Sequence, residues 1–464
     1  MKKALFLTGL LFYILFSGTA FAQTNEETET DTAILKKIEQ WKDLKFGLLM
    51  HWGTYSQWGI VESWSLCSED EPWCLRKMKN YADYCKAYTK LKETFNPVRF
   101  DPEKWAEAAK YAGMKYVIFT TKHHDGFCMF DSHQTDYKIT DVACPFHTNP
   151  RANVAKEIFN AFRAKGFLAG AYFSKPDWHS NDYWAEEWAT PNRNVNYDIK
   201  KYPERWQRFC DFTYKQIEEL MTGYGKLDIL WLDGGWVNPK NGQDINIPKI
   251  AAMARRYQPG LLVVDREVPG KFENYRTPEQ QVPDKPLDYP WETCMTMATS
   301  WSYVPGDIYK PAGKLIHTLI DIVAKGGNFL LNIGPSPEGE FADTAYSRLK
   351  EIGDWMKINS EAIYNSRPVA PYKTGKVALT RNPDGTVYAL YMADSCENKI
   401  PSEIRIHGIQ FPNSATVSLL GKKGNLKWNH CQDGICIMVP PADRKNPPCH
   451  YAWVFKIQDK NKGK

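Results

Sequence analysis

Residues 227–235 read LDILWLDGG, a short apolar run that ends in a carboxylate and two glycines. A run of this length, bounded by turn residues, is typical of a buried strand. Similar runs recur along the first three quarters of the chain, and amphipathic segments separate them. This alternation is what a parallel sheet with crossover helices requires. The runs are Phe46–His51, Lys115–Thr121, Phe167–Ser174, Leu227–Asp233, Leu261–Arg266 and Asn328–Ile333.

The segments between these runs carry the start and stop signals of helices. Asp101 and Pro102 supply an N-cap and a first-turn proline, and Gly113 follows the end of the apolar stripe. Pro203 and Pro311 begin two further segments with apolar residues at helical spacing. At least six strand–helix units within about 320 residues predict an α/β fold, a (β/α)8-like TIM barrel, with a doubly wound open sheet as the alternative.

The pattern changes after Arg367. Short alternating or β-branched runs follow, separated by turn signals such as NPDG at 382–385, and they predict an antiparallel β-sandwich. We therefore expect a (β/α)8-like domain over 23–367, a C-terminal β-sandwich over 368–458 and a polar tail over 459–464. The expected strands are Val377–Thr380, Thr386–Met392, Glu403–His407, Thr416–Leu420, Cys436–Met438 and Tyr451–Lys456.

The chain begins with MKKALFLTGLLFYILFSGTAFA at 1–22, in which two lysines precede an apolar run and a small-x-small ending. This pattern is typical of a cleaved secretory signal peptide. Its apolar part is shorter than the roughly 20 residues that a membrane span needs, and no other stretch comes close, so we expect no membrane span. The chain has no Asn-x-Ser/Thr acceptor, which favours a periplasmic or secreted bacterial protein over a glycosylated lysosomal one.

The eleven cysteines form no C-x-x-C pair, and their odd number leaves at least one thiol unpaired within the chain. Cys431 and Cys436 are near enough in sequence to close a small loop in an oxidising compartment. Sequence spacing alone does not decide the pairing.

The amino-acid composition argues against nucleic acid as a binding partner. The chain has 464 residues, with 59 Lys and Arg against 54 Asp and Glu, and this small excess is far from the clustered basic surface of a nucleic-acid binder. Aromatic residues make up 14% and include 17 Trp. Flat apolar faces with polar edges suit the C–H faces of sugars, although large aromatics also fill protein cores.

Polar side chains follow the ends of five of the predicted strands. The carboxyl ends of barrel strands meet at one face, so we expect an active site there. Arg266 can pair with Asp233 and keep it ionised, as a nucleophile requires. The residues in question are His51, His123, His124, Tyr172, Trp231, Asp233 and Arg266.

Hydrolysis of a glycoside needs a second carboxyl group. The long segment Val268–Pro290 has no helix pattern and is bracketed by two candidates, Glu279 and Glu292. Ordered barrel loops of this length are usually functional. Trp291 beside Glu292 would raise the pKa of that carboxyl by desolvation, as a general acid requires.

Two other classes of protein stay open at this point. Three histidines and a carboxylate could hold a metal, as in metal-dependent barrel hydrolases. Adjacent residues on a strand point to opposite faces, however, so His123 and His124 cannot both be ligands from a regular strand. We therefore expect neither a metal nor a cofactor. A carbohydrate-binding barrel protein without catalytic activity is the other alternative.

The sequence resembles glycoside hydrolase family 29, the α-L-fucosidases. The matching stretches span the barrel, and they are residues 46–56, 95–132, 172–178, 228–236, 291–294 and 325–339. The resemblance implies a (β/α)8-like catalytic domain followed by a C-terminal β-sandwich. It also implies an exo-acting enzyme that releases terminal α-L-fucose from a fucosylated oligosaccharide or glycoconjugate.

The same resemblance implies a retaining double displacement in which Asp233 is the nucleophile. We prefer Glu292 as the acid/base because it lies in the family's Trp-Glu-x-Cys signature, and Glu279 is the alternative. The positions that match the family's fucose pocket are His51, Trp64, His123, His124, Tyr172, Trp231 and Arg266.

Overall fold

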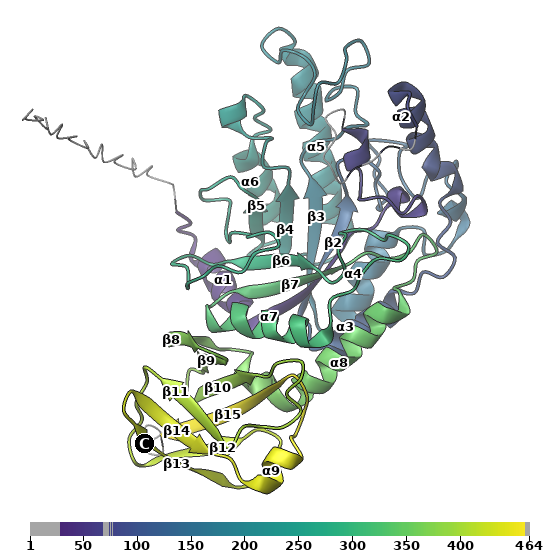
Figure 1. The fold of residues 1–464 in the computed structure, drawn as a ribbon. Helices are drawn as coiled ribbons and strands as arrows, with labels where there is room; N and C mark the ends of the chain where they lie inside the picture. Colours follow the sequence, from purple (N-terminus) through teal and green to yellow (C-terminus); the bar gives the residue numbers. More distant parts are fainter. Residues whose placement is uncertain (1–27, 68–73, 75, 77, 460–464) are drawn as a thin grey trace, which may run out of the picture.

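The computed structural model describes residues 28–67, 74, 76 and 78–459 (Figure 1). The expected signal peptide and residues 460–464 of the expected tail lie outside the described residues. Within the described part, no helix is both long and apolar enough to cross a membrane.

The larger body of the protein is built on a parallel sheet, in the order β5-β4-β3-β2-β1-β7-β6. Nearly every residue of these strands is buried, because helices cover the outer side of the sheet and side chains fill its inner side. The barrel-like α/β fold is therefore confirmed, with seven rather than eight strands in the sheet. The strands are β1 (Phe46–Met50), β2 (Tyr116–Lys122), β3 (Leu168–Ser174), β4 (Ile229–Asp233), β5 (Leu262–Asp265), β6 (Glu292–Thr296) and β7 (Asn328–Ile333).

Helices surround this sheet, with α3 packed between α4 and α8 and with α5 beside α6 (Figure 1). The side chain of Asp101 caps α3 by accepting the N–H of Lys104 at 3.0 Å, as the sequence predicted. The helices are α1 (Thr32–Leu44), α2 (Tyr81–Thr89), α3 (Pro102–Tyr111), α4 (Val154–Ala164), α5 (Pro203–Gly223), α6 (Ile247–Tyr257), α7 (Ala312–Ala324) and α8 (Asp343–Asn359).

β5 and β6 form the two ends of the sheet and are not paired with each other. The segment 272–280 lies between them. Glu273 bridges antiparallel to β5, Glu279 bridges parallel to β6, and Arg276 bridges parallel to Trp291, which directly precedes β6. This irregular segment takes the place of an eighth strand. The sequence pattern predicted neither the barrel position of 272–280 nor strand β6. The segment 272–280 lies within a stretch that has the pattern of a loop, and β6 begins just after that stretch.

The C-terminal body is an antiparallel sheet in the order β11-β14-β13-β12-β15-β10-β9-β8. Its outer strands, β11 and β8, come into contact, so the sheet is nearly closed around its own apolar core. The antiparallel β architecture is confirmed, and β8 and β13 are strands that the sequence did not predict. The elements are β8 (Arg367–Thr374), β9 (Val377–Arg381), β10 (Val387–Met392), β11 (Glu403–His407), β12 (Ala415–Leu419), β13 (Asn425–Cys431), β14 (Gly434–Met438), α9 (Pro441–Lys445) and β15 (Ala452–Asp459).

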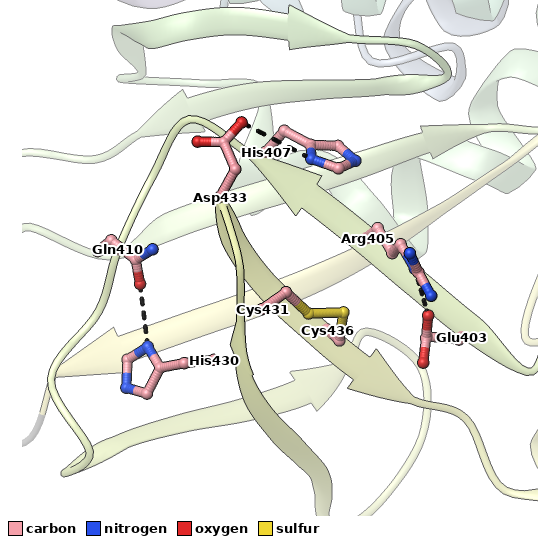
Figure 2. Close-up of a disulfide and its surroundings, with 8 residues drawn as sticks. All are labelled: Glu403, Arg405, His407, Gln410, His430, Cys431, Asp433 and Cys436. Atoms are coloured by element: carbon pink, nitrogen blue, oxygen red, sulfur yellow. Dashed lines mark hydrogen bonds and ion pairs between the residues drawn. A yellow bond between two sulfur atoms is a disulfide. The ribbon is translucent and has the colours of Figure 1, made fainter.

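Figure 2 shows the hairpin between β13 and β14, where a disulfide joins Cys431 to Cys436. The C-terminal sheet is also tied to the larger body: α7 packs on β8 and β9, and the indole of Trp355 in α8 donates to the carbonyl of Ala452 at 2.9 Å. The two bodies therefore share a buried junction.

Candidate active site

A pocket of about 190 Å³ opens at the carboxyl ends of the parallel strands. It brings together residues from β1 to β6 and from the loops that follow them. Of the ten site residues expected from the sequence, all but Glu292 line it. The nine are His51, Trp64, His123, His124, Tyr172, Trp231, Asp233, Arg266 and Glu279.

Asp233 is the last residue of β4, and its two carboxylate oxygens have separate partners. Arg266 Nη1 donates to Oδ1 at 2.8 Å, and the Tyr172 hydroxyl donates to Oδ2 at 2.6 Å. Burial alone would raise the pKa of Asp233, but Arg266, His124 and Tyr172 outweigh burial and hold this pKa well below its usual range. Asp233 is therefore ionised near pH 7.

The backbone behind Asp233 depends on a glycine. Gly234 has a φ of +89°, and a Cβ at this position would lie 2.4 Å from Pro176 Cδ. A larger residue would therefore be both strained and blocked. The two glycines that follow the apolar run in the sequence let the chain turn sharply and leave the carboxylate at the pocket.

Three buried histidines form part of the pocket wall, and each is held through Nδ1. His51 contacts Asn332 Oδ1 at 2.8 Å, His123 contacts Ser63 Oγ at 2.5 Å and His124 contacts Ser174 Oγ at 2.7 Å. Burial lowers the pKa of His51 and His124 to about 4, and it lowers the pKa of His123 well below the usual value. All three are neutral imidazoles near pH 7, suited to hydrogen bonds with hydroxyl groups.

His123 and His124 do not point to opposite faces, contrary to the prediction from a regular strand. β2 ends at Lys122, so both residues lie beyond the regular strand, and both line the pocket. Ligand atoms of His123, His124 and Asp233 lie within 4.8 Å of one another, a spacing that a metal could use. The guanidinium of Arg266, 2.8 Å from Asp233, opposes a cation there because it already neutralises the carboxylate.

The two candidate acids occupy different places. Glu279 lies on the segment 272–280, is 41% exposed, lines the pocket and accepts a hydrogen bond from Arg266 Nη2. Glu292 is the first residue of β6, so it lies toward the opposite end of the strand from the pocket. It is fully buried, it accepts a hydrogen bond from the Tyr116 hydroxyl at 2.6 Å, and burial raises its pKa to about 8.

Several pocket residues were not predicted from the sequence. Glu62, in the loop after β1, is buried, accepts the N–H of Ser302 at 2.8 Å and has a pKa raised by burial to about 8. Arg193, Trp236 and Trp301 also line the pocket. Trp236 follows Asp233 by three positions and could have been found from that spacing. The other three lie in irregular loops that carry no periodic signal.

An ionised carboxylate, a second carboxyl group on the same arginine, neutral histidines and tryptophans at the open end of a barrel define a glycoside hydrolase site. The α-L-fucosidase family model matches residues 14–361, and the model of the α-L-fucosidase C-terminal domain matches residues 371–458. The chain belongs to the α-L-fucosidase family, glycoside hydrolase family 29.

Individual relatives agree with this assignment. Tissue α-L-fucosidase of Mus musculus is 28% identical over 92% of this chain and 93% of its own length, and tissue α-L-fucosidase of Homo sapiens is 28% identical over 97% and 96%. α-L-Fucosidase isoenzyme 1 from Paenibacillus thiaminolyticus superposes with a TM-score of 0.74 at 29% identity, covering 92% of this chain and 99% of that one. A Bacteroides thetaiotaomicron family 29 α-L-fucosidase, solved as a trapped covalent intermediate, has a TM-score of 0.72 at 25% identity, covering 94% and 98%.

Proposed function

We propose that this α-L-fucosidase is exo-acting and retaining, with Asp233 as nucleophile and Glu279 as acid/base. One observation carries the proposal: a single guanidinium, that of Arg266, contacts both carboxylates inside one pocket. Retaining enzymes hold their two carboxyl groups about 5–5.5 Å apart, and two groups that share an arginine are held close together. The position of Glu279 at the pocket moves our preference away from Glu292.

In the first step, the Asp233 carboxylate attacks the anomeric carbon of an α-L-fucoside. The bond from this carbon to the leaving oxygen breaks, and the oxygen takes the proton of Glu279. In the second step, the Glu279 carboxylate takes a proton from water as the water oxygen attacks the same carbon and frees Asp233. Two inversions give net retention.

The second step needs Glu279 in its ionised form, so that it can take a proton from water. For the first step Glu279 must be protonated. The side chain of Glu279 is 41% exposed, against 14% for Asp233, so solvent and an entering substrate can reach it.

The depth of the pocket supports exo action on a terminal sugar. Its inner wall consists of buried side chains, among them His51, His123, Tyr172 and Trp231, so a chain could not pass through it. The neutral histidines suit the hydroxyl groups of one pyranose, and Tyr172 and Trp231, whose rings stack 5.2 Å apart, give the wall a flat apolar surface.

The test is hydrolysis of 4-nitrophenyl α-L-fucoside, followed by ¹H NMR from the first turnover. Retention predicts that α-L-fucose appears first. With azide, Asp233→Gly should give β-L-fucosyl azide, because a single displacement inverts the anomeric carbon. First formation of β-L-fucose by the wild type would contradict the retaining mechanism. Fucose binding without any turnover would favour the carbohydrate-binding alternative.

We also propose export through the signal peptide at 1–22 and a division into catalytic domain 23–367 and β-sandwich domain 368–458. The support for export is the sequence pattern alone. The start of β8 at Arg367 supports the division. N-terminal sequencing of the mature protein, with residue 23 expected first, tests the cleavage.

A further inference from the structure

The mouth of the pocket differs from its inner wall. Trp64, Arg193 and Trp236 line the pocket but are only partly buried, whereas the histidines and Tyr172 are buried. A terminal fucose enters with its anomeric carbon toward the mouth, where the rest of the glycan leaves. Side chains at the mouth therefore face the leaving group rather than the fucose.

Arg193 stands over two of these rings. Its guanidinium lies 4.7 Å from the ring of Trp64 and 5.4 Å from the ring of Trp236, and the two indoles are 5.8 Å apart and tilted by 56°. Contacts of this kind are favourable cation–π interactions. A planar guanidinium on an aromatic surface can donate from its edge, and its five N–H groups allow Arg193 to donate to a ligand beside the interactions it already makes.

The backbone at Arg193 is anchored as well. Its carbonyl oxygen lies 3.2 Å from Trp178 Nε1 and 3.1 Å from the Tyr183 hydroxyl. The neighbouring Asn194 accepts a hydrogen bond from Gln243 Nε2 at 2.7 Å. The loop between β3 and α5 is thereby fastened to the segment after β4, and Arg193 is set at a defined place beside the pocket.

We propose that Arg193 and Trp236 form a subsite for the sugar to which the fucose is linked. Arg193 donates hydrogen bonds to hydroxyl or ring oxygens of this sugar, and Trp236 offers it an apolar edge. A hexose or N-acetylhexosamine fits both groups, because its oxygens accept from Arg193 and its C–H face packs on Trp236. This inference rests on the proposed fucosidase activity.

The experiment compares substrates with and without a leaving sugar. α-L-Fucosyl fluoride has none, and a set of neutral trisaccharides carries fucose in α1,2, α1,3, α1,4 or α1,6 linkage. For Arg193→Met, kcat/KM on the best trisaccharide should fall about tenfold or more, as expected for a lost hydrogen bond from a charged donor, with less than about a twofold change on the fluoride. Arg193→Lys keeps the charge but loses the forked arrangement of N–H donors. Its kcat/KM on the trisaccharide should lie between those of the wild type and Arg193→Met.

Arg205→Met is the matched control. Arg205 lies over Trp188 and Tyr197, its ion pair is with Glu187, and it does not line the pocket, so this substitution should leave both rates unchanged. A parallel fall on fluoride and trisaccharide in both Arg193 variants would show that Arg193 only supports the wall and would overturn the subsite. The subsite would also be overturned if the Arg193 variants kept the wild-type kcat/KM on the trisaccharide. The same holds if the wild type cleaved the fluoride and none of the trisaccharides. A wild type that cleaves neither substrate would refute the proposed function instead.

Discussion

Lys175 Nζ lies 2.5 Å from Asp265 Oδ1, in a buried ion pair that joins the carboxyl ends of β3 and β5. Lys175 also donates its backbone N–H to the carbonyl of Asp233 at 2.9 Å, and Arg266 directly follows Asp265. The ion pair therefore holds the backbone at both residues of the Asp233–Arg266 contact, although neither of its side chains lines the pocket.

Lys175→Met should lower both stability and kcat. The substitution leaves the carboxylate of Asp265 buried without its partner, at a cost of about 3–5 kcal/mol, and it loosens the backbone that positions Arg266. We expect a lower Tm, and we expect the double variant Lys175→Met/Asp265→Leu to recover part of it. Lys37→Met breaks a less buried pair with Asp228, just before β4 and at the opposite end of the strand from the pocket, and is the control: it should lower Tm, by less than Lys175→Met does, without lowering kcat. Equal losses of kcat in both single variants would contradict the positioning role.

Glu279→Ala should slow the release of sugar leaving groups far more than the release of fluoride, since fluoride needs little help from an acid. Azide should restore turnover and give α-L-fucosyl azide, because azide attacks the covalent intermediate and completes a second inversion. Glu292→Gln should show neither effect. If azide rescued the Glu292 variant and not the Glu279 variant, the assignment of the acid would be reversed.

Glu292 should make the protein less stable as the pH rises. The unfolded chain releases this proton near pH 4.5, whereas burial raises the pKa in the folded protein to about 8. The stabilising contribution of the protonated form is complete below about pH 4.5 and is lost as the pH approaches 8. In Tm measurements from pH 5 to 8, the wild type should therefore fall more steeply than Glu292→Gln. Parallel curves would mean that Glu292 titrates normally.

Chelation should leave the activity unchanged. His123, His124 and Asp233 are close enough to bind a cation, but Arg266 already provides the positive charge that Asp233 accepts. We expect the same kcat/KM on 4-nitrophenyl α-L-fucoside after dialysis against an excess of EDTA. Loss of activity that a divalent metal restores would support the metal-dependent alternative.

Replacing Cys431 and Cys436 by serine should reduce stability without changing catalysis. The disulfide closes a very short loop, for which chain entropy predicts about 2 kcal/mol. The hairpin of Figure 2 belongs to the C-terminal sheet, so kcat/KM should match that of the wild type. Cys396 is exposed and unpaired, and Cys396→Ser should leave the Tm unchanged. A fall in kcat/KM would indicate coupling between the two bodies.

Strands that are apolar along their whole length were predictable from the sequence, and polar ones were not. β7 was predicted with its observed bounds, Asn328–Ile333. β6 has the sequence ETCMT and is completely buried, because its neighbours cover it rather than because its side chains are apolar. β13 alternates only weakly between half-buried and exposed residues, and β8 contains two prolines. In these cases tertiary contacts outweigh local propensity.

The candidate site was predictable where its residues follow regular strands. The register of parallel strands brings their ends together, which places Asp233 and Arg266 side by side. Glu62, Arg193 and Trp301 come from loops, and no period in the sequence marks them. The sequence could not show which of Glu279 and Glu292 lies at the pocket: the motif around Glu292 begins a strand, and only the three-dimensional path of 272–280 brings Glu279 there.

The irregular segment 272–280, which replaces an eighth strand, affects which sequence changes the active site can accept during evolution. One residue added within a regular strand turns every following side chain to the other face unless a bulge absorbs it. Asp233, at the end of β4, is bound by that constraint. The segment that carries Glu279 has no such register, so residues can be gained or lost there and a carboxyl group can still reach the pocket. The proposed nucleophile is therefore tied to one sequence position, whereas the proposed acid can change its sequence position between related proteins.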